Sequence, residues 1–179
     1  MTTGFNAGCR PFIGLDGCFL KTSFGGQLLS AVGRDGNNQM FPLAIAIVEA
    51  ETKETWTWFI GNLLHAIGCG YRNSITFISD RQKGLVDTFE ELLPDADHRY
   101  CIRHLYANFK ALYKGQALKD ELWWAATSYR VHDFEKYMET IKELDTGAYD
   151  WLKDIDPCQW SRAYFNPRSN QRQANYHNA

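Results

Sequence analysis

The stretch FIGLDGCFLK at residues 12–21 decides the predicted fold. Its aromatic and β-branched residues are typical of a strand, and Asp16 interrupts this otherwise apolar run. A second run, SITFIS at residues 74–79, is typical of a strand buried in the middle of a sheet, and Asp80 follows it directly. Two buried strands therefore each carry an aspartate, a side chain that is costly to bury without a partner or an ion.

Turn-forming residues divide the N-terminal part of the chain into three strands. The β-rich runs at residues 12–21, 27–33 and 40–49 are separated by Gly25-Gly26 and by Asp-Gly-Asn-Asn at residues 35–38. Connections this short leave no room for a crossover helix, so neighbouring strands run antiparallel. The sequence therefore predicts a three-strand antiparallel meander.

Beyond residue 49, helical patterns alternate with two short extended segments. Apolar residues at helical spacing predict a helix over 54–67 and another from Leu85 to Leu93, on either side of the strand at 74–79. A brief extended piece at 98–101 follows, and only helical patterns come after it. This order predicts an α/β fold with a ribonuclease-H-like mixed sheet, in which the fourth strand lies parallel beside the first.

The domain organisation follows from this pattern. The 179 residues are enough for one domain with a hydrophobic core. We expect a leader at 1–11, the ribonuclease-H-like core at 12–115, a C-terminal helical insertion or appendage at 116–165, and a flexible tail at 166–179.

Composition excludes several classes of protein. Apolar residues make up 45% and charged residues 22% of the chain, as in globular proteins, and the five cysteines lack the spacing of a disulfide scaffold. The formal net charge of −2 requires any contact with nucleic acid to be local. The longest apolar stretch, residues 41–48, is too short to span a membrane. We expect an intracellular protein, nuclear or cytoplasmic, with no visible targeting signal.

Asp16 and Asp80 are the candidate catalytic and metal-binding residues. If the first and fourth strands are neighbours, the two carboxylates converge at one sheet edge, where they would share Mg²⁺ or Mn²⁺. Two such ions clamp the attacking and leaving oxygens of a phosphodiester. The alternative is structural: Asp80 precedes a helix and would be its N-cap, while Asp16-Gly17 would be a turn or a bulge. The residues alone leave both interpretations open.

Cys101 and His104 form a C-x-x-H pair at the start of a predicted helix. A structural zinc site needs four ligands, and His98 and Cys158 are the further candidates, but no second tight pair occurs. The spacing therefore favours a buried free cysteine and a histidine at a polar edge over a zinc site.

Three basic residues near this pair are candidates for DNA binding. Arg103, Lys110 and Lys114 share one face of the predicted helix and would track a phosphate backbone. A helix face exposed only to solvent has the same pattern, so this alternative also stays open.

Five motifs, in order along the chain, resemble the plant Mutator-like element (MULE) transposase domain. They are LDGCFLK at 15–21, FPLA at 41–44, Glu51 followed by WTWF at 56–59, SDRQKGL at 79–85 and HRYCIRHLYAN at 98–108. The resemblance runs from about Phe12 to Pro167, which is nearly the whole chain.

This resemblance implies a ribonuclease-H-like DDE transposase core that cuts and joins DNA with two metal ions held by Asp, Asp and Glu. Asp16 corresponds to the first carboxylate and Asp80 to the second. Cys101 and His104 correspond to the family's C-x-x-H element, and the following helices to its helical insertion. Cys18 stands where the family more usually has Thr.

The family's third carboxylate has no counterpart in the expected place. It is a Glu in an Asn-Asn-x-x-Glu-x-x-Asn motif, and no glutamate follows Glu143. Asp87, Glu90 and Glu91 are poor substitutes because they lie on a helix whose apolar face should meet the sheet. The family's flanking N-terminal DNA-binding region and C-terminal zinc knuckle have no counterpart either, although Met1 suggests a natural start.

We therefore expect a domesticated, non-catalytic fragment of a DDE transposase that acts through a protein partner or a homo-oligomer. One alternative is an active metal-dependent transposase or nuclease module that carries out cut-and-paste strand transfer. Another is a DNA-binding regulator, which the net charge of −2 disfavours.

Overall fold

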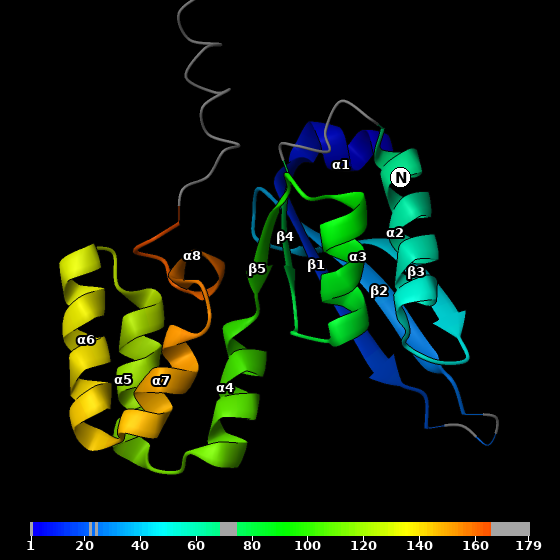
Figure 1. The fold of residues 1–179 in the computed structure, drawn as a ribbon. Coiled ribbons are helices and arrows are strands. Elements are labelled where there is room, and N and C mark those ends of the chain that lie inside the picture. Colours follow the sequence, from blue (N-terminus) through cyan, green and yellow to red (C-terminus); the bar gives the residue numbers. More distant parts are fainter. Residues whose placement is uncertain (1, 22, 24, 69–74, 166–179) are drawn as a thin grey trace, which may run out of the picture. The chain divides into compact units, whose positions relative to one another are not determined.

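The protein is described here from a computed structural model. Its described residues are 2–21, 23, 25–68 and 75–165. The chain divides into two compact units, the first ending at His98 and the second beginning at Arg99. Figure 1 shows that the first unit combines a sheet with helices, whereas the second is built from helices.

The first unit is organised around a five-stranded mixed sheet. Its strands are β1 (Cys9–Phe19), β2 (Gln27–Asp35), β3 (Met40–Val48), β4 (Thr76–Ser79) and β5 (Asp97–Tyr100). They lie in the order β3-β2-β1-β4-β5, and β5 carries the chain from the first unit into the second. β1 pairs antiparallel with β2, and β2 with β3, which confirms the predicted meander.

The parallel neighbour of β1 is β4, as predicted. Phe12 pairs with Thr76, Ile13 with Phe77 and Gly14 with Ile78. The helix α2 (Lys53–Ile67) lies in the connection between the meander and β4, as a parallel crossover requires. The predicted mixed α/β sheet is therefore confirmed for the described residues.

Three helices belong to this unit. Besides α2 they are α1 (Thr2–Gly8) and α3 (Lys83–Leu92). Their buried side chains share one hydrophobic cluster with alternate residues of the sheet, among them Ile13, Leu15 and Leu29. The helix α1 falls in the expected leader and was not predicted, because its seven residues carry only Phe5 as a large apolar side chain.

The second unit has its own hydrophobic cluster. Its helices are α4 (Ile102–Leu112), α5 (Gln116–Thr127), α6 (Val131–Leu144), α7 (Thr146–Lys153) and α8 (Pro157–Trp160). The core contains Leu122 and Ile141, both fully buried. Leu105 and Phe109 of α4 pack into this cluster, so α4, which we had assigned to the core region 12–115, packs with the helical unit.

Two expectations fall outside the described residues: the start of the fourth strand at Ser74 and the flexible tail at 166–179. Within the parts of the chain that the structure describes, no helix has the length and apolar character needed to cross a membrane.

Candidate functional site

Strand pairing brings Asp16 and Asp80 to neighbouring positions. Extending the β1–β4 register two residues beyond the pair Gly14 and Ile78 places Asp16 beside Asp80, directly after the end of β4. Asp16 lies within β1, paired with Ser30 of β2, and the only register shift of this pair of strands lies between Cys9 and Ile13. The alternative that Asp16 belongs to a turn or bulge is therefore wrong.

Asp80 is not the N-cap of the following helix. The N-cap of α3 is Gln82, whose side-chain Oε1 accepts a hydrogen bond from the Leu85 amide at 2.7 Å. Asp80 instead accepts a hydrogen bond at Oδ1 from the Gln82 amide at 3.1 Å. Gln82 also donates from Nε2 to the Glu51 carbonyl oxygen at 3.1 Å, and so ties the loop after β4 to the end of β3.

Glu51 is a third carboxylate at this place, and the sequence reasoning gave it no role in the site. Its Oε1 accepts a hydrogen bond from Nε1 of the fully buried Trp56 at 3.0 Å. Partial burial raises the pKa of Glu51; the Trp56 hydrogen bond lowers it, and the charges of Asp80 and Asp16 raise it further. The charges of Asp16 and Asp80 thus act on Glu51, and we call Asp16, Glu51 and Asp80 the carboxylate edge.

Two glycines allow this close approach. A Cβ atom on Gly17 would lie 2.8 Å from the Glu51 carboxylate, and one on Gly84 would lie 2.7 Å from the Lys53 backbone nitrogen. At Gly84 the contact is with backbone atoms, so glycine is required where α3 approaches the start of α2. At Gly17 the contact is with the end of the Glu51 side chain, which a larger residue would displace from its place beside β1.

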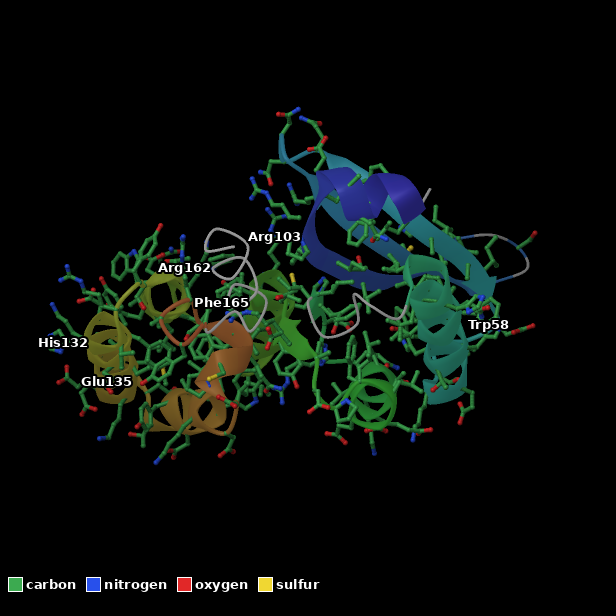
Figure 2. All side chains as sticks on the ribbon, turned by 90° about the horizontal axis from the view of Figure 1, so that it is seen from above. Trp58, Arg103, His132, Glu135, Arg162 and Phe165 are labelled. Carbon is green, nitrogen blue, oxygen red and sulfur yellow. The ribbon has the colours of Figure 1, made fainter. Side chains whose placement is uncertain are left out.

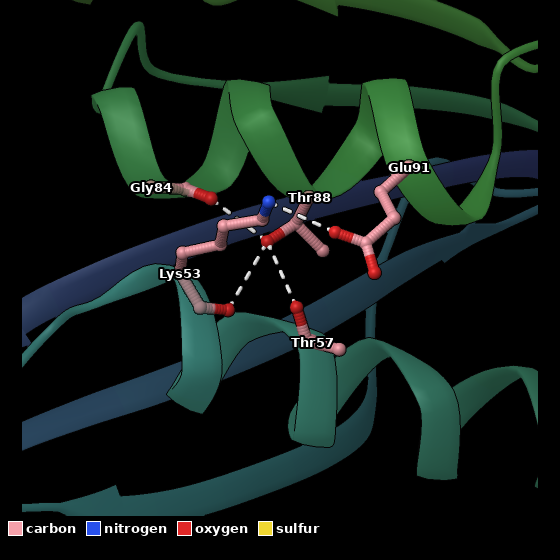
Figure 3. Close-up of polar contacts among 5 residues, drawn as sticks. All are labelled: Lys53, Thr57, Gly84, Thr88 and Glu91. Carbon is pink, nitrogen blue, oxygen red and sulfur yellow. Dashed lines mark hydrogen bonds and ion pairs between the residues drawn. The ribbon is translucent and has the colours of Figure 1, made fainter.

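Polar contacts link α3 to the first turns of α2 (Figure 3). Thr88 Oγ1 lies 2.7 Å from the Gly84 carbonyl oxygen, 3.2 Å from that of Lys53 and 3.4 Å from Thr57 Oγ1. Lys53 Nζ forms an ion pair with Glu91 at 2.8 Å. Because Glu51 precedes α2 and Asp80 precedes α3, these contacts fix the spacing of the two carboxylates.

The acidic residues of α3 do not join the carboxylate edge. Glu91 is engaged with Lys53, its side chain is 56% exposed, and Glu90 is exposed as well. The apolar face of α3, with Leu85 and Phe89, is buried toward the sheet. This arrangement agrees with the expectation that the helix presents its acidic side chains away from the sheet.

His98 supports the backbone of Asp80 from β5. Its Nε2 lies 2.7 Å from Ser79 Oγ, and Ser79 Oγ donates to the Asp80 carbonyl oxygen at 2.7 Å. The His98 ring stacks on Phe89, with ring centroids 3.9 Å apart. Burial lowers the pKa of His98 to about 4, so the ring is neutral at pH 7. Since the Ser79 proton is used toward Asp80, His98 donates to Ser79 from Nε2.

The donor set of the carboxylate edge suits Mg²⁺ or Mn²⁺, because both prefer carboxylate oxygens. Across the described residues, no three His, Cys, Asp or Glu side chains converge tightly enough to form a ready-made metal site. Partial burial is the main cause of the raised pKa of Glu51, and the like charges of Asp80 and Asp16 raise it further. The residues fit a divalent cation by chemistry and by position, with side-chain rearrangement on binding.

Cys101 and His104 lie in the second unit and do not form a zinc site in the part of the chain described. Cys101 is the N-cap residue of α4 with no side-chain cap, and its thiol is free. His104 Nδ1 is buried without a hydrogen-bond partner among the described residues. Cys101 is only half-buried, so the expectation of a buried cysteine is wrong, and the choice between a free cysteine and a zinc ligand stays a prediction.

The three basic residues expected to bind DNA do not share one helix. Arg103 and Lys110 are exposed on α4, but α4 ends at Leu112 and its C-cap residue, Tyr113, is extended. Lys114 therefore lies beyond the helix. A single continuous face made of all three residues was the wrong expectation, because the spacing alone did not reveal where the helix ends.

The sequence matches a family model described as MULE transposase domain over residues 12–108. The matched segment covers more than half of the chain and contains Asp16, Glu51 and Asp80 as well as Cys101 and His104. No curated protein matches the chain.

Proposed function

The chain belongs to the MULE transposase domain family, and from that premise we propose that it is a metal-dependent DNA strand-cleavage and strand-transfer module of the DDE type. The observation that carries the proposal is the carboxylate edge. Asp16 and Asp80 come together through the β1–β4 pairing, and Glu51 reaches the same place from the end of β3. A third carboxylate beside Asp16 and Asp80 supports an active module over the non-catalytic fragment expected from the sequence.

In this proposal Asp16, Asp80 and Glu51 hold Mg²⁺ or Mn²⁺. When bound, such a cation stabilises the negative charge that develops on a phosphodiester and activates the attacking hydroxyl group. The protein's own residues set the position of the ligands: Trp56 holds Glu51 Oε1, Gln82 holds Asp80 Oδ1, and Ser79 holds the Asp80 carbonyl.

The fold proposed for this module is ribonuclease-H-like. The order β3-β2-β1-β4-β5, the antiparallel meander and the parallel β1–β4 pair support that assignment. So does the placement of one carboxylate within β1 and one directly after β4.

The test is calorimetric titration of the full chain with MgCl₂ and with MnCl₂, paired with cleavage of a labelled DNA duplex. We expect Asp16→Asn, Asp80→Asn and Glu51→Gln each to weaken metal binding and to reduce cleavage by orders of magnitude. Glu90→Gln is the matched control, because Glu90 is exposed on α3. Metal binding and cleavage that persist in Asp16→Asn would refute the proposal.

A second candidate is a domesticated, non-catalytic protein that acts through a partner or a second copy. It is favoured by exposed apolar side chains on β3, which is the edge strand of the sheet. Ile45 is 65% exposed and Ile47 72%, and both lie on the opposite face from the buried Leu29 and Ala31 of β2. Absence of metal binding in the wild type, together with self-association lost in Ile45→Ser/Ile47→Ser, would favour this candidate.

A further inference from the structure

The helical unit gathers arginines at one end. Its four arginines, between residues 99 and 165, are Arg99, Arg103, Arg130 and Arg162. Arg103 lies in the first turn of α4, Arg130 is the N-cap residue of α6, and Arg162 follows α8. The Arg162 amide donates to the Ala126 carbonyl oxygen at 2.9 Å, which joins this last segment to the end of α5.

Arg162 is exposed and lies on an exposed aromatic ring. Its guanidinium carbon is 3.7 Å from the centre of the Tyr129 ring, and Tyr129 is 73% exposed. This stacking orients the guanidinium plane against the ring while its N–H donors stay at the edge of that plane. Tyr129 therefore holds the charge of Arg162 in place without neutralising it.

Arg99 repeats the arrangement beside it. Its guanidinium carbon lies 4.6 Å from the centre of the Phe165 ring, and Nη2 donates to the Ser161 carbonyl oxygen at 2.5 Å. Phe165 is 41% exposed, and its amide donates to the Arg162 carbonyl oxygen at 3.0 Å. Figure 2 shows Arg162 and Phe165 next to each other on the helical unit. The segment 161–165 thus carries the stacked Arg162 and supplies the ring and the carbonyl oxygen that hold Arg99.

Arg162 has no salt bridge to a carboxylate among the described residues, and the same holds for Arg103 and Arg130. Asp156 and Glu135 lie in this region, but Asp156 accepts from the Cys158 amide at 2.9 Å, and Glu135 is a hydrogen-bond partner of Tyr164.

The end of α6 offers a matched contrast. Lys142 also lies over a tyrosine, 5.5 Å from the centre of the Tyr149 ring, but its Nζ forms an ion pair with Glu139 at 3.2 Å. Arg162 and Lys142 therefore both lie over a tyrosine ring, and of these two only Lys142 has an ion pair among the described residues.

We propose that a surface of the helical unit binds the phosphate backbone of DNA. The residues of this surface are Arg99, Tyr129, Arg130, Arg162 and Phe165. The choice of DNA as ligand rests on the proposed function. Guanidinium groups match phosphate oxygens in geometry, and their stacking reduces the conformational entropy lost on binding. Contacts of arginine with phosphate oxygens carry no sequence information, so this binding does not read the base sequence.

The experiment measures binding of the full chain to a short fluorescein-labelled duplex by anisotropy, in EDTA, over a series of KCl concentrations. Each phosphate contact contributes about 0.9 to the slope of log K against log salt. We expect Arg162→Ala to reduce that slope by about 0.9, and Arg130→Ala/Arg162→Ala by about 1.8. Arg162→Lys keeps the charge and should keep the slope, with weaker binding. Circular dichroism checks that every variant folds.

Lys142→Ala is the control and should leave both affinity and slope unchanged. The proposal is overturned if the wild-type chain does not bind the duplex, if Arg162→Ala keeps the wild-type slope, or if Lys142→Ala reduces it equally. The measurement is independent of the proposed catalytic function, because EDTA removes divalent metal. DNA binding without cleavage would refute the catalytic proposal alone, and cleavage with an unchanged slope in Arg162→Ala would refute this one alone.

Discussion

The carboxylate edge of the first unit and the stacked arginines of the second each bring together side chains of one charge sign. The two regions differ in the contacts that hold those side chains. At the carboxylate edge, strand pairing and two glycines bring Asp16, Glu51 and Asp80 together, and the pKa of Glu51 is raised by partial burial and further by the charges of the two aspartates. In the helical unit, Arg99 and Arg162 lie on aromatic rings. The first arrangement brings like charges together at a partly buried place, whereas in the second each guanidinium lies on an aromatic ring and Arg162 is exposed.

The two regions also differ in what fixes them. Hydrogen bonds to buried or partly buried groups hold the carboxylate edge, through Trp56, Gln82 and Ser79. Stacking on exposed rings holds Arg162. Buried polar networks are costly to break, whereas exposed cation–π contacts contribute about 0.5–1 kcal/mol each. Perturbations should therefore affect the stability of the first unit more than that of the second.

The largest expected effect is acid sensitivity of the first unit through His98. Its folded pKa of about 4 lies below the ordinary 6.5, so between these values the unfolded chain binds the extra proton. The contribution of His98 to the free energy of unfolding is fully present above pH 6.5, and roughly 3 kcal/mol of it is lost as the pH drops toward 4. His98→Gln keeps a donor for Ser79 and should remove this dependence from urea unfolding curves.

The control for this measurement is His132→Gln, since His132 is exposed on α6 of the second unit. It should keep the wild-type pH profile. If His98→Gln and the wild type lose stability in parallel between pH 6.5 and 4, His98 is not the group responsible. The expectation that perturbations affect the first unit more than the second would then lose its main support.

The next effect concerns the packing that positions Glu51. Gly84→Ala places a Cβ 2.7 Å from the Lys53 nitrogen and 2.9 Å from the Thr52 carbonyl carbon, which are backbone atoms with little freedom to move. We expect a loss of about 1–3 kcal/mol in the free energy of unfolding. Metal affinity should fall as well, because the end of β3 moves away from Asp80.

Gly61→Ala is the matched control on α2, where nothing lies within 4 Å of the added Cβ. Alanine is the better helix former, so this variant should be more stable by about 0.5–1 kcal/mol. Equal effects of the two substitutions on unfolding would contradict the close approach of α3 to the start of α2.

The sequence predicted the strand arrangement well, because turn residues and short connections restrict how a meander can pair. The partnership of Asp16 and Asp80 followed from that topology. Glu51 was missed as a site residue because its position depends on the Trp56 hydrogen bond and on Gly17 and Gly84, which are tertiary features. No periodicity of the sequence marks a carboxylate that reaches a site from a loop.

The helical unit was less predictable for the same reason. Helical spacing indicated a shared face for Lys110 and Lys114, but the chain leaves the helix after Leu112. The stacking of Arg162 on Tyr129 joins residues that are far apart in sequence and depends on how α5 and the segment after α8 pack. Sequence spacing within one helix carries no information on such a contact.

The smallest expected effect tests the charge repulsion itself. Glu51→Gln keeps an oxygen acceptor for Trp56 and removes one of three like charges. The raised pKa of Glu51 means that its ionised form is disfavoured in the folded state, so stability is lost as pH rises through the folded pKa. At pH 7 without divalent metal, Glu51→Gln should therefore stabilise the protein, by less than about 1 kcal/mol because the group is partly exposed.

A double-mutant cycle separates repulsion from other effects of this substitution. In an Asp16→Asn/Asp80→Asn background the gain from Glu51→Gln should shrink, because its repulsive partners are gone. Arg162→Gln supplies the comparison from the second unit: it removes a stacked charge and should not stabilise the protein. If Glu51→Gln increases the free energy of unfolding equally in the double-Asn background, the charges of Asp16 and Asp80 do not act on Glu51. Charge repulsion would then give no reason for the carboxylate edge to bind a cation.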